Sequence, residues 1–306
     1  MANFRTSPSI STSATGNESS TLAAVSPSPS SGSRRTSASD ISDADFLTIT
    51  VPKKQAIGLL YGRATVGKTA FVTLFAPQPS VVINLDGRAD PAIADAIEQG
   101  RDVKKAIVEY PTFYMDPPEM KKAAGASMER FFALCERASK AFRTCLIDTG
   151  TELDDIFKLA FDGVVGEKTK EGAIGKDIYF VNNMWRRVFN IFNQSECHLI
   201  VAARETEIWD YANAEARVKT PTGNFKPTIS RVPFDACTVI MQIVTERNTG
   251  IKSDSKVNTS IKIIGSGACR AELGNIYTEK DWGEHGPFAY VFWKQFEKST
   301  TIEEWK

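Results

Sequence analysis

The chain has 306 residues, 42% of them hydrophobic, and its 37 Lys and Arg residues balance its 37 Asp and Glu residues. This length accommodates one large α/β domain or two small ones. The zero net charge excludes a global basic field, so nucleic-acid binding would have to rest on local patches. No apolar run reaches the ~20 residues of a membrane-spanning helix, and we expect a soluble protein without a membrane partner.

Cysteine and histidine usage predicts neither a disulfide framework nor a structural metal. The five cysteines lie far apart without a C-x-x-C pair, and the chain has only two histidines. Such a set contains no metal-ligand spacing. We therefore expect reduced, mostly buried thiols in a cytoplasmic protein.

Residues 1–45 differ in composition from the rest of the chain, because 19 of them are Ser or Thr and few are large and apolar. A segment of this kind buries too little apolar surface to offset its ordering entropy, which predicts a disordered tail. A Ser-rich, Arg-containing start also suits an organelle transit peptide. No clear amphipathic Arg face is visible, however, and the tail is the preferred interpretation.

The next stretch carries the most specific motif of the chain. Its residues match G-x-x-x-x-G-K-[ST], between a strand-like run at 56–61 and a helix-compatible run at 69–75. This is the pattern of a P-loop, in which backbone N–H groups cradle phosphate, the lysine reaches the β- and γ-phosphates and the hydroxyl ligates Mg²⁺. The predicted nucleotide-binding residues are Gly62, Arg63, Ala64, Thr65, Val66, Gly67, Lys68 and Thr69.

A buried strand is predicted at 81–85, followed directly by Asp86-Gly87. We expect this strand to lie next to the P-loop strand, with Asp86 at the edge where α/β sheets bind ligands. Two interpretations stay open. Asp86 is a candidate for orienting the attacking water, and it equally suits a simple Asp-Gly turn.

Further elements alternate along the chain: a helix at 91–99, a strand at 106–110, a long amphipathic helix at 117–142 and a buried strand at 144–149. The last strand ends in Asp148. An apolar strand that ends in Asp downstream of a P-loop is the Walker B arrangement, whose carboxylate holds the Mg²⁺ shell from the strand next to the P-loop. Asp148 is therefore the predicted metal-side residue.

Glu152 lies one helical turn beyond Asp148 and is a candidate general base. The spacing of Thr149 and Glu152 also fits the S/T-x-x-E capping box of a helix N-terminus. The capping role is slightly preferred. The helix continues through 154–165.

A Gly- and Lys-containing loop at 166–177 and an amphipathic helix at 178–193 lead to a buried strand at 197–203. Arg204 and Glu205 follow this strand, where P-loop ATPases often place a polar sensor of the γ-phosphate. A solvated salt bridge is the alternative for this pair. The two interpretations have comparable weight.

Residues 206–236 form a long polar segment that three prolines interrupt. Long loops in compact domains are usually functional or mobile. The segment mixes cations with aromatic residues, the combination that single-stranded nucleic acid needs for phosphate contact and base stacking. A disordered segment or a hairpin that packs on the domain remains the alternative.

Two more strands are predicted at 238–244 and 258–264, the second at a sheet edge because its apolar residues alternate with polar ones. The stretch 277–306 is rich in aromatic residues and carries no readable chemistry. We expect three parts: the tail 1–45, a P-loop ATPase domain 46–276, and a C-terminal extension 277–306 that packs on the core. Alternating strands and helices around a P-loop predict a three-layer α/β sandwich with a mainly parallel central sheet.

The order of the motifs YGRATVGKTAFVTLFAP, VVINLDG, TCLIDTGTEL and HLIVAARETE resembles the RecA-like P-loop ATPases of phages over roughly residues 55–245. Members are usually nucleotide-binding proteins, and one branch resembles single-strand annealing or recombination mediators. The resemblance implies ATP and Mg²⁺ as cofactors, Asp148 as the Walker B residue and Asp86 as the catalytic acid or base. The chain departs from the family at Asp86, where a Glu is usual, and at Arg204, where a His is common.

Two functions follow from these features. The first is a Mg²⁺-dependent ATPase, an activity that the P-loop predicts. It would act on single-stranded DNA in recombination, annealing or replication and work as a homo-oligomer. It would act in the host cytoplasm if phage-encoded, with an arginine finger from among Arg231, Arg247 and Arg270. The second is a low-turnover nucleotide-dependent switch or scaffold that works through protein partners. A small-molecule kinase ranks last because no acceptor-site motif or Arg-rich lid is present, and the lack of an N-K-x-D motif favours adenine over guanine.

Overall fold

The structure is a computed structural model, and it describes residues 55–111, 115–165, 176–213, 218–247, 257–266, 273–296 and 300–306. These residues belong to one compact unit, 52–306. The expected tail at 1–45, residues 166–175 of the expected loop and the finger candidate Arg270 lie outside the described residues.

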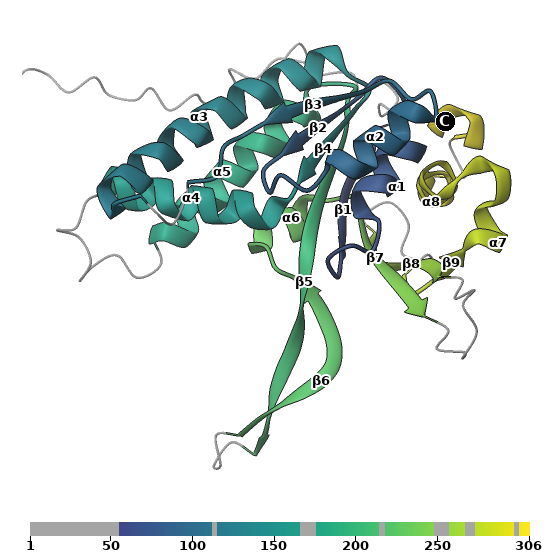
Figure 1. Ribbon diagram of the computed structural model, residues 1–306. Helices are drawn as coiled ribbons and strands as arrows, with labels where there is room; N and C mark the ends of the chain where they lie inside the picture. Colours follow the sequence, from purple (N-terminus) through teal and green to yellow (C-terminus); the bar gives the residue numbers. More distant parts are fainter. Residues whose placement is uncertain are drawn as a thin grey trace, which may run out of the picture. The chain divides into compact units, whose positions relative to one another are not determined.

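Strands form the centre of the described unit. Six of them run parallel in the order β3-β2-β4-β5-β1-β7, and β8 and β9 continue the sheet in antiparallel orientation, while β6 pairs with β5 alone. This arrangement, shown in Figure 1, confirms the prediction of an α/β fold with a mainly parallel sheet. The strands are β1 (Ile57–Gly62), β2 (Ser80–Asn84), β3 (Val103–Ile107), β4 (Thr144–Asp148), β5 (His198–Asn213), β6 (Val218–Pro227), β7 (Val239–Arg247), β8 (Val257–Ser266) and β9 (Ile276–Thr278).

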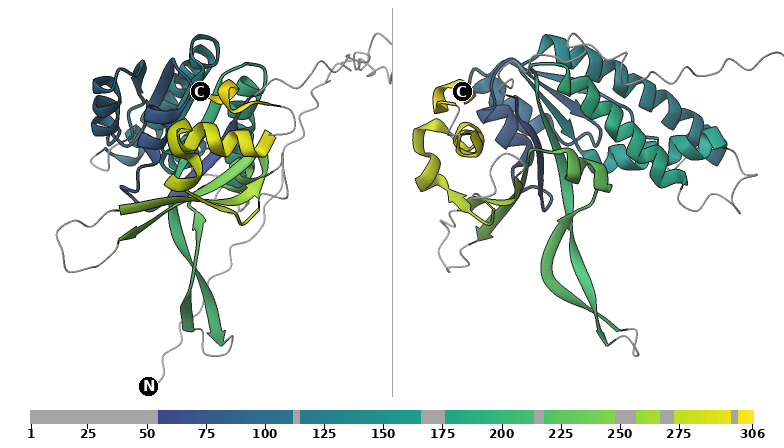
Figure 2. Two further views of the ribbon diagram at one scale, coloured as in Figure 1. Left: turned by 90° about the vertical axis from the view of Figure 1, so that its right-hand side faces the viewer. Right: turned by 180° about the vertical axis from the view of Figure 1, so that it is seen from behind.

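Helices cover both faces of the sheet, as the two views of Figure 2 show. One face carries α3 (Pro117–Ala141), α4 (Gly150–Val165) and α5 (Lys176–Asn193), and the other carries α1 (Lys68–Phe75), α2 (Asp90–Glu98) and α8 (Pro287–Phe296). Shorter elements are α6 (Arg231–Ala236), α7 (Glu279–Trp282), η5 (Gly283–His285) and η6 (Ile302–Trp305). In the parts of the chain that the structure describes, no helix combines the length and the apolar character that crossing a membrane requires.

Successive residues of the central strands contribute to two separate cores. Leu59 and Ile147 pack with α3, α4 and α5, whereas Leu60 and Leu146 pack with α1, α2 and α8. All four side chains are fully buried, which stabilises the fold by about 1.5–3 kcal/mol for each. Burial on both faces explains why these strands are continuous apolar runs in the sequence.

The strand order corrects one expectation about the site. We expected the strands that precede Asp86 and Asp148 to lie next to the P-loop strand, but β1 pairs with β5 and β7 instead. β5 lies between β1 and β4, and β2 lies on the far side of β4. The strand β5, which comes late in the sequence, therefore lies at the centre of the sheet between β4 and β1. Local periodicity does not predict this position.

The segment 206–236 is not the loop that its polarity predicts. β5 runs on to Asn213 and pairs with β6 in an antiparallel hairpin, which extends away from the helical layers in Figure 1. The short helix α6 follows. The strands escaped prediction because both faces of the hairpin are solvent-exposed, so its sequence carries no apolar alternation.

Two smaller expectations are also wrong. The strand predicted at 106–110 is β3, Val103–Ile107, an edge strand whose exposed Lys104 and Lys105 hide its strand character. β8 is not the sheet edge, because β9 pairs with it between Ser260 and Lys262. Aromatic side chains that follow β9 pack on the face that carries α1, and Phe288, Phe292 and Trp305 are fully buried there.

Candidate active site

The P-loop spans the turn between a buried strand and a helix, as predicted. β1 ends at Gly62 and α1 begins at Lys68. A Cβ atom on Gly62 would lie 2.8 Å from the carbonyl oxygen of Ile243, so a side chain here would push β1 and β7 apart. Gly67 has a φ of 92°, in the left-handed region that favours glycine. No side chain caps α1, so its first N–H groups are available to bind an anion.

Lys68 lies inside this loop. Its Nζ atom donates hydrogen bonds to the carbonyl oxygens of Gly62 at 3.0 Å and Arg63 at 2.6 Å. The residue is 8% exposed, and burial lowers the pKa of its amine, while the carboxylates of Asp148 and Glu205 oppose that shift. The amine is thus held at the centre of the turn whose N–H groups form the phosphate cradle.

Thr69 and Asp148 meet at the start of α1. The Thr69 hydroxyl donates a 2.7 Å hydrogen bond to Oδ2 of Asp148, the last residue of β4. Asp148 is 4% exposed, and burial raises the pKa of its carboxyl, although the hydrogen bond from Thr69 acts in the opposite direction. The structure therefore brings the two predicted metal-side residues together.

Arg204 contacts the other two predicted carboxylates, those of Asp86 and Glu152. Its Cα atom is in register with that of Gly62, because β5 lies beside β1. One guanidinium nitrogen of Arg204 contacts Oε1 of Glu152 and lies 3.7 Å from Oδ2 of Asp86. Three segments that are far apart in the sequence thus place Asp86, Glu152 and Arg204 in one cluster beside the P-loop.

Both carboxylates also make the local contacts of the alternative interpretations. Asp86 accepts the Arg88 N–H at 2.9 Å, which closes a turn. Glu152 accepts the hydroxyl of Thr149, so the pair expected of a capping box does meet, here through two side chains. The water-orienting roles of Asp86 and Glu152 remain predictions.

Glu205 connects the P-loop to the hairpin. Its side chain is 7% exposed and lies 3.4 Å from Nε of Arg63, and it accepts a hydrogen bond from Gln242 at 3.1 Å. The guanidinium of Arg63 in turn lies over the ring of Phe225 on β6, 5.4 Å from its centroid. These four residues line a cavity of about 160 Å³.

Sequence analysis missed Gln242 and Phe225 as members of this site. Gln242 is the polar residue inside the apolar run TVIMQIV, and an interruption of that kind at a strand beside a P-loop was a usable signal. Phe225 gave no such signal, because its contact with Arg63 depends on the hairpin.

Two of the arginine-finger candidates, Arg231 and Arg247, lie in described elements. Arg231 begins α6 and pairs with Asp235 of the same helix at 3.0 Å, with 85% of its side chain exposed. Arg247 ends β7. The identity of a finger supplied by a neighbouring copy stays a prediction.

The residues of the cluster fit a magnesium-bound triphosphate. Across the described ranges, no three His, Cys, Asp or Glu side chains form a group that would hold a metal ion. Mg²⁺ in phosphate-binding sites usually takes only one or two carboxylates from the protein and shares phosphate oxygens. The adjacent oxygens of Thr69 and Asp148, beside a buried lysine and a glycine-containing turn, supply that donor set.

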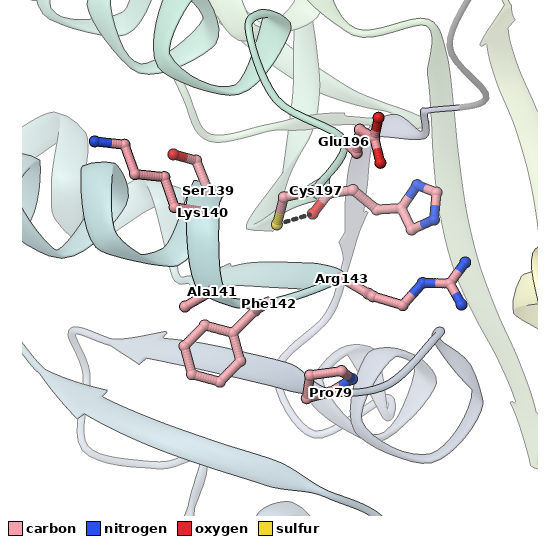
Figure 3. Close-up of a pocket in the computed structure, with 9 residues that line it drawn as sticks. Pro79, Ser139, Lys140, Ala141, Phe142, Arg143, Glu196 and Cys197 are labelled. Atoms are coloured by element: carbon pink, nitrogen blue, oxygen red, sulfur yellow. Dashed lines mark hydrogen bonds between the residues drawn. The ribbon is translucent and has the colours of Figure 1, made fainter.

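A different cavity, of about 680 Å³, lies at the opposite edge of the sheet, where β4 and β5 begin. Figure 3 shows its lining, in which the side chains of Lys140 and Arg143 extend to opposite sides and do not converge. Ligands of parallel α/β sheets bind at the carboxyl ends of the strands. This rule favours the P-loop edge as the candidate functional edge.

Comparison with known proteins agrees with the geometry. A family model described as AAA domain matches residues 54–254, which is more than half of the chain and includes the P-loop, Asp86, Asp148 and Arg204. A search of curated proteins gives no match. The chain belongs to the AAA domain family of P-loop ATPases.

Proposed function

We propose that the protein is a Mg²⁺-dependent ATPase that acts on single-stranded DNA, in recombination, annealing or replication. Membership of the AAA domain family supports nucleotide binding in general. The observation that carries the DNA part is the link between the P-loop and the hairpin through Arg63, Glu205 and Phe225. Arg63 belongs to the P-loop, whereas Glu205 and Phe225 belong to the two strands of the hairpin, so their contacts connect the phosphate site to the hairpin.

The chain's own residues divide the work of hydrolysis. N–H groups of Gly62–Thr69 and the Lys68 amine bind and orient the phosphates. Thr69 and Asp148 would hold Mg²⁺, which supplies charge neutralisation at the phosphates. Asp86 orients the attacking water and accepts its proton, and Arg204 holds Asp86 and Glu152 in place.

The hairpin is the proposed DNA-binding arm. Trp209 on β5 is 55% exposed and its neighbour Ile208 is 36% exposed, although large apolar side chains are usually covered. Lys226 lies on the paired strand opposite Thr206. An exposed indole and nearby cations suit base stacking and phosphate contact in a single strand.

Coupling between the two sites runs through Arg63. This residue lies in the P-loop, and its guanidinium contacts both a buried carboxylate of β5 and an aromatic ring of β6. A change in the loop on nucleotide binding would therefore alter the base of the hairpin. That is how the γ-phosphate would control the grip on DNA in this proposal.

A second candidate is a low-turnover nucleotide switch that acts through protein partners. The ion pairs of Arg204 with Asp86 and Glu152 favour it, because they engage both candidate water-orienting carboxylates. The hairpin also carries Glu207 and Asp210, so its charge is mixed and not purely basic. The exposed Trp209 and Ile208 would then bind an apolar protein surface.

Salt dependence separates these two candidates. Retention of the full chain on immobilised single-stranded DNA with ATP and Mg²⁺ should weaken steeply between 50 and ~200 mM salt if several phosphates are bound. The absence of any retention at low salt would contradict the DNA proposal and favour the protein-partner switch.

We further propose that the active form is a homo-oligomer, as in phage ATPases, in which a neighbouring copy supplies an arginine.

A further inference from the structure

The hairpin has a second connection to the carboxylate cluster, which passes through Thr151 and not through Arg63. Thr151 is the second residue of α4. Its hydroxyl donates a 2.9 Å hydrogen bond to the carbonyl oxygen of Thr228 and accepts the Arg204 N–H at 3.1 Å. The Thr228 N–H in turn donates to the carbonyl oxygen of Arg204 at 2.7 Å. Three hydrogen bonds therefore join Thr151, Arg204 and Thr228 in a closed ring.

The members of this ring lie where the hairpin leaves the sheet. Arg204 is in register with Gly62 at the end of β1, and the pairing of β5 with β6 begins one residue later, at Glu205. Thr228 is the residue that follows β6. The hydroxyl of Thr151 thus contacts both strands of the hairpin at its root, one through Arg204 and the other through Thr228.

The start of α4 packs closely against this root. A Cβ atom on Gly150 would lie 2.6 Å from Cγ1 of Val201 on β5 and 2.7 Å from Cδ1 of Ile229, the residue after Thr228. Both distances are shorter than the ~3.5–4.0 Å of a favourable contact between carbon atoms. The helix therefore lies directly against β5 and against the chain that leaves the hairpin, so a shift of the root displaces the start of α4.

Thr151 and Glu152 together hold Arg204. Thr151 binds its main-chain N–H, and Glu152 contacts its guanidinium, which also lies 3.7 Å from Oδ2 of Asp86. A displacement of the Arg204 backbone would change the contacts of both candidate water-orienting carboxylates. The ring is a stiffer connection than the ion pair of Arg63, because that side chain is 72% exposed and exposed ion pairs contribute little.

We propose that Thr151 is the positioning residue that couples the hairpin to the nucleotide site. A ligand bound to the hairpin moves its root, and the ring passes this movement to Arg204 and from there to Asp86 and Glu152. Thr151 acts through Arg204 and not by contact with the nucleotide. The inference rests on the proposed function and deepens it by naming the residue through which DNA regulates hydrolysis.

Equilibrium binding of a labelled single-stranded oligonucleotide by the full chain, with and without AMP-PNP and Mg²⁺, measures this coupling without turnover. Two coupled sites change each other's affinity by the same factor, and we expect AMP-PNP to raise the DNA affinity of the wild-type protein by about 5-fold or more. Thr151→Val keeps the shape of the side chain and removes its hydroxyl. It should reduce the factor to less than about 2-fold, while each ligand still binds alone.

Two variants separate this role from a general loss of hydrogen bonds. Thr151→Ser keeps the hydroxyl and should keep the wild-type factor. Thr222→Val is the matched control, because the Thr222 hydroxyl likewise donates to a carbonyl oxygen, that of Ile208 at 2.7 Å, and accepts an N–H, that of Asn224 at 3.2 Å. These partners lie within the hairpin and away from its root, so this variant should also keep the factor.

Amide hydrogen exchange tests the same ring without DNA. AMP-PNP with Mg²⁺ should slow the exchange of the amides around Thr228 in the wild-type protein, because the nucleotide fixes Arg204 and the ring fixes Thr228. Thr151→Val should lose this response although it still binds AMP-PNP. Thr151→Ser should retain it.

The outcomes distinguish this proposal from the proposed function. An unchanged coupling factor in Thr151→Val, or an equal loss in Thr222→Val, overturns the role of Thr151. Exchange around Thr228 that does not respond to bound AMP-PNP in the wild-type protein also overturns it. A protein that binds AMP-PNP but no DNA contradicts the proposed function instead, and the exchange measurement then decides on Thr151 alone.

Discussion

The hydroxyl of Thr69 donates a 2.7 Å hydrogen bond to the carboxylate of Asp148, although 79 residues separate them in the sequence. The bond joins the start of α1 to the end of β4 across the intervening strand β5. The two oxygen atoms proposed to hold Mg²⁺ thus lie side by side next to the P-loop. The position of Mg²⁺ in the proposed mechanism depends on this pair.

Asp148→Asn should lower the apparent affinity for Mg²⁺ without destabilising the fold. Loss of the charge should raise the Mg²⁺ concentration that half-maximal ATP turnover requires by about 10- to 100-fold. Burial raises the pKa of Asp148, so its charge is unfavourable in the folded state and the amide should leave the melting temperature unchanged or higher. The matched control is Asp155→Asn on α4, whose side chain is 49% exposed. An unchanged Mg²⁺ requirement in Asp148→Asn contradicts the metal assignment.

Asp86 and Glu152 should respond differently to removal of their charge. Asp86→Asn should lower kcat by about 10²-fold, as loss of a general base does, with little effect on stability. Glu152→Gln loses its ion pair with Arg204 and weakens its contact with Thr149, so it should lower the free energy of unfolding by about 1 kcal/mol and kcat by less than about 5-fold. Steady-state kinetics and urea unfolding measure both quantities. A larger loss of kcat in Glu152→Gln than in Asp86→Asn would assign the general-base role to Glu152 and contradict its assignment to Asp86.

Trp209→Ala should reduce the affinity for single-stranded DNA. Base stacking on an aromatic ring contributes about 1–3 kcal/mol, so the dissociation constant should rise about 5- to 100-fold. Tyr179→Ala on α5 is the matched control, because that ring is 73% exposed and lies on a helix away from the hairpin. Fluorescence anisotropy with a labelled oligonucleotide gives both constants. Equal changes of the dissociation constant in the two variants would contradict the assignment of the hairpin to the DNA-binding site.

His198 should make the fold sensitive to mild acid. Its Nδ1 atom accepts the Ala56 N–H at 2.9 Å, and burial, aided by Arg143, lowers the pKa of His198 from 6.5 to about 4. The unfolded chain binds this proton first, so the stability that the neutral ring contributes is complete above pH 6.5 and is lost as the pH falls toward 4. The free energy of unfolding should drop by about 3 kcal/mol over this range.

His198→Gln tests that origin of the pH dependence. The Gln side chain does not titrate, and its oxygen can still accept from Ala56. Urea unfolding at pH 7.5 and at pH 4.5 should show a smaller difference in this variant than in the wild-type protein. The same difference in both proteins would assign the acid sensitivity to other groups.

Sequence periodicity predicted the elements that are buried on both sides. β1, β2, β4 and the start of β5 are continuous apolar runs, and Lys68, Thr69 and Asp148 lie at the helix start and strand end that the motifs predicted, although β4 is not the neighbour of β1. Their local sequence specifies their local structure, because a P-loop needs glycine at fixed positions and a lysine between strand and helix.

Long-range pairing was not predictable in the same way. The insertion of β5 between β1 and β4 depends on contacts between residues such as Leu59 and Val201, which are far apart in the sequence. The hairpin was missed because its exposed strands lack apolar alternation, and with it the contact of Phe225 with Arg63.

The most direct measurement is ATP hydrolysis by the full chain with and without single-stranded DNA, with Lys68→Ala as the control. We predict Mg²⁺-dependent turnover that DNA stimulates, and its loss by about 10²-fold or more in Lys68→Ala, because the buried amine lies within the phosphate cradle. ATP binding without turnover and without any effect of DNA would contradict the proposed ATPase and favour the protein-partner switch. Turnover that persists in Lys68→Ala would contradict the assignment of the P-loop as the catalytic site.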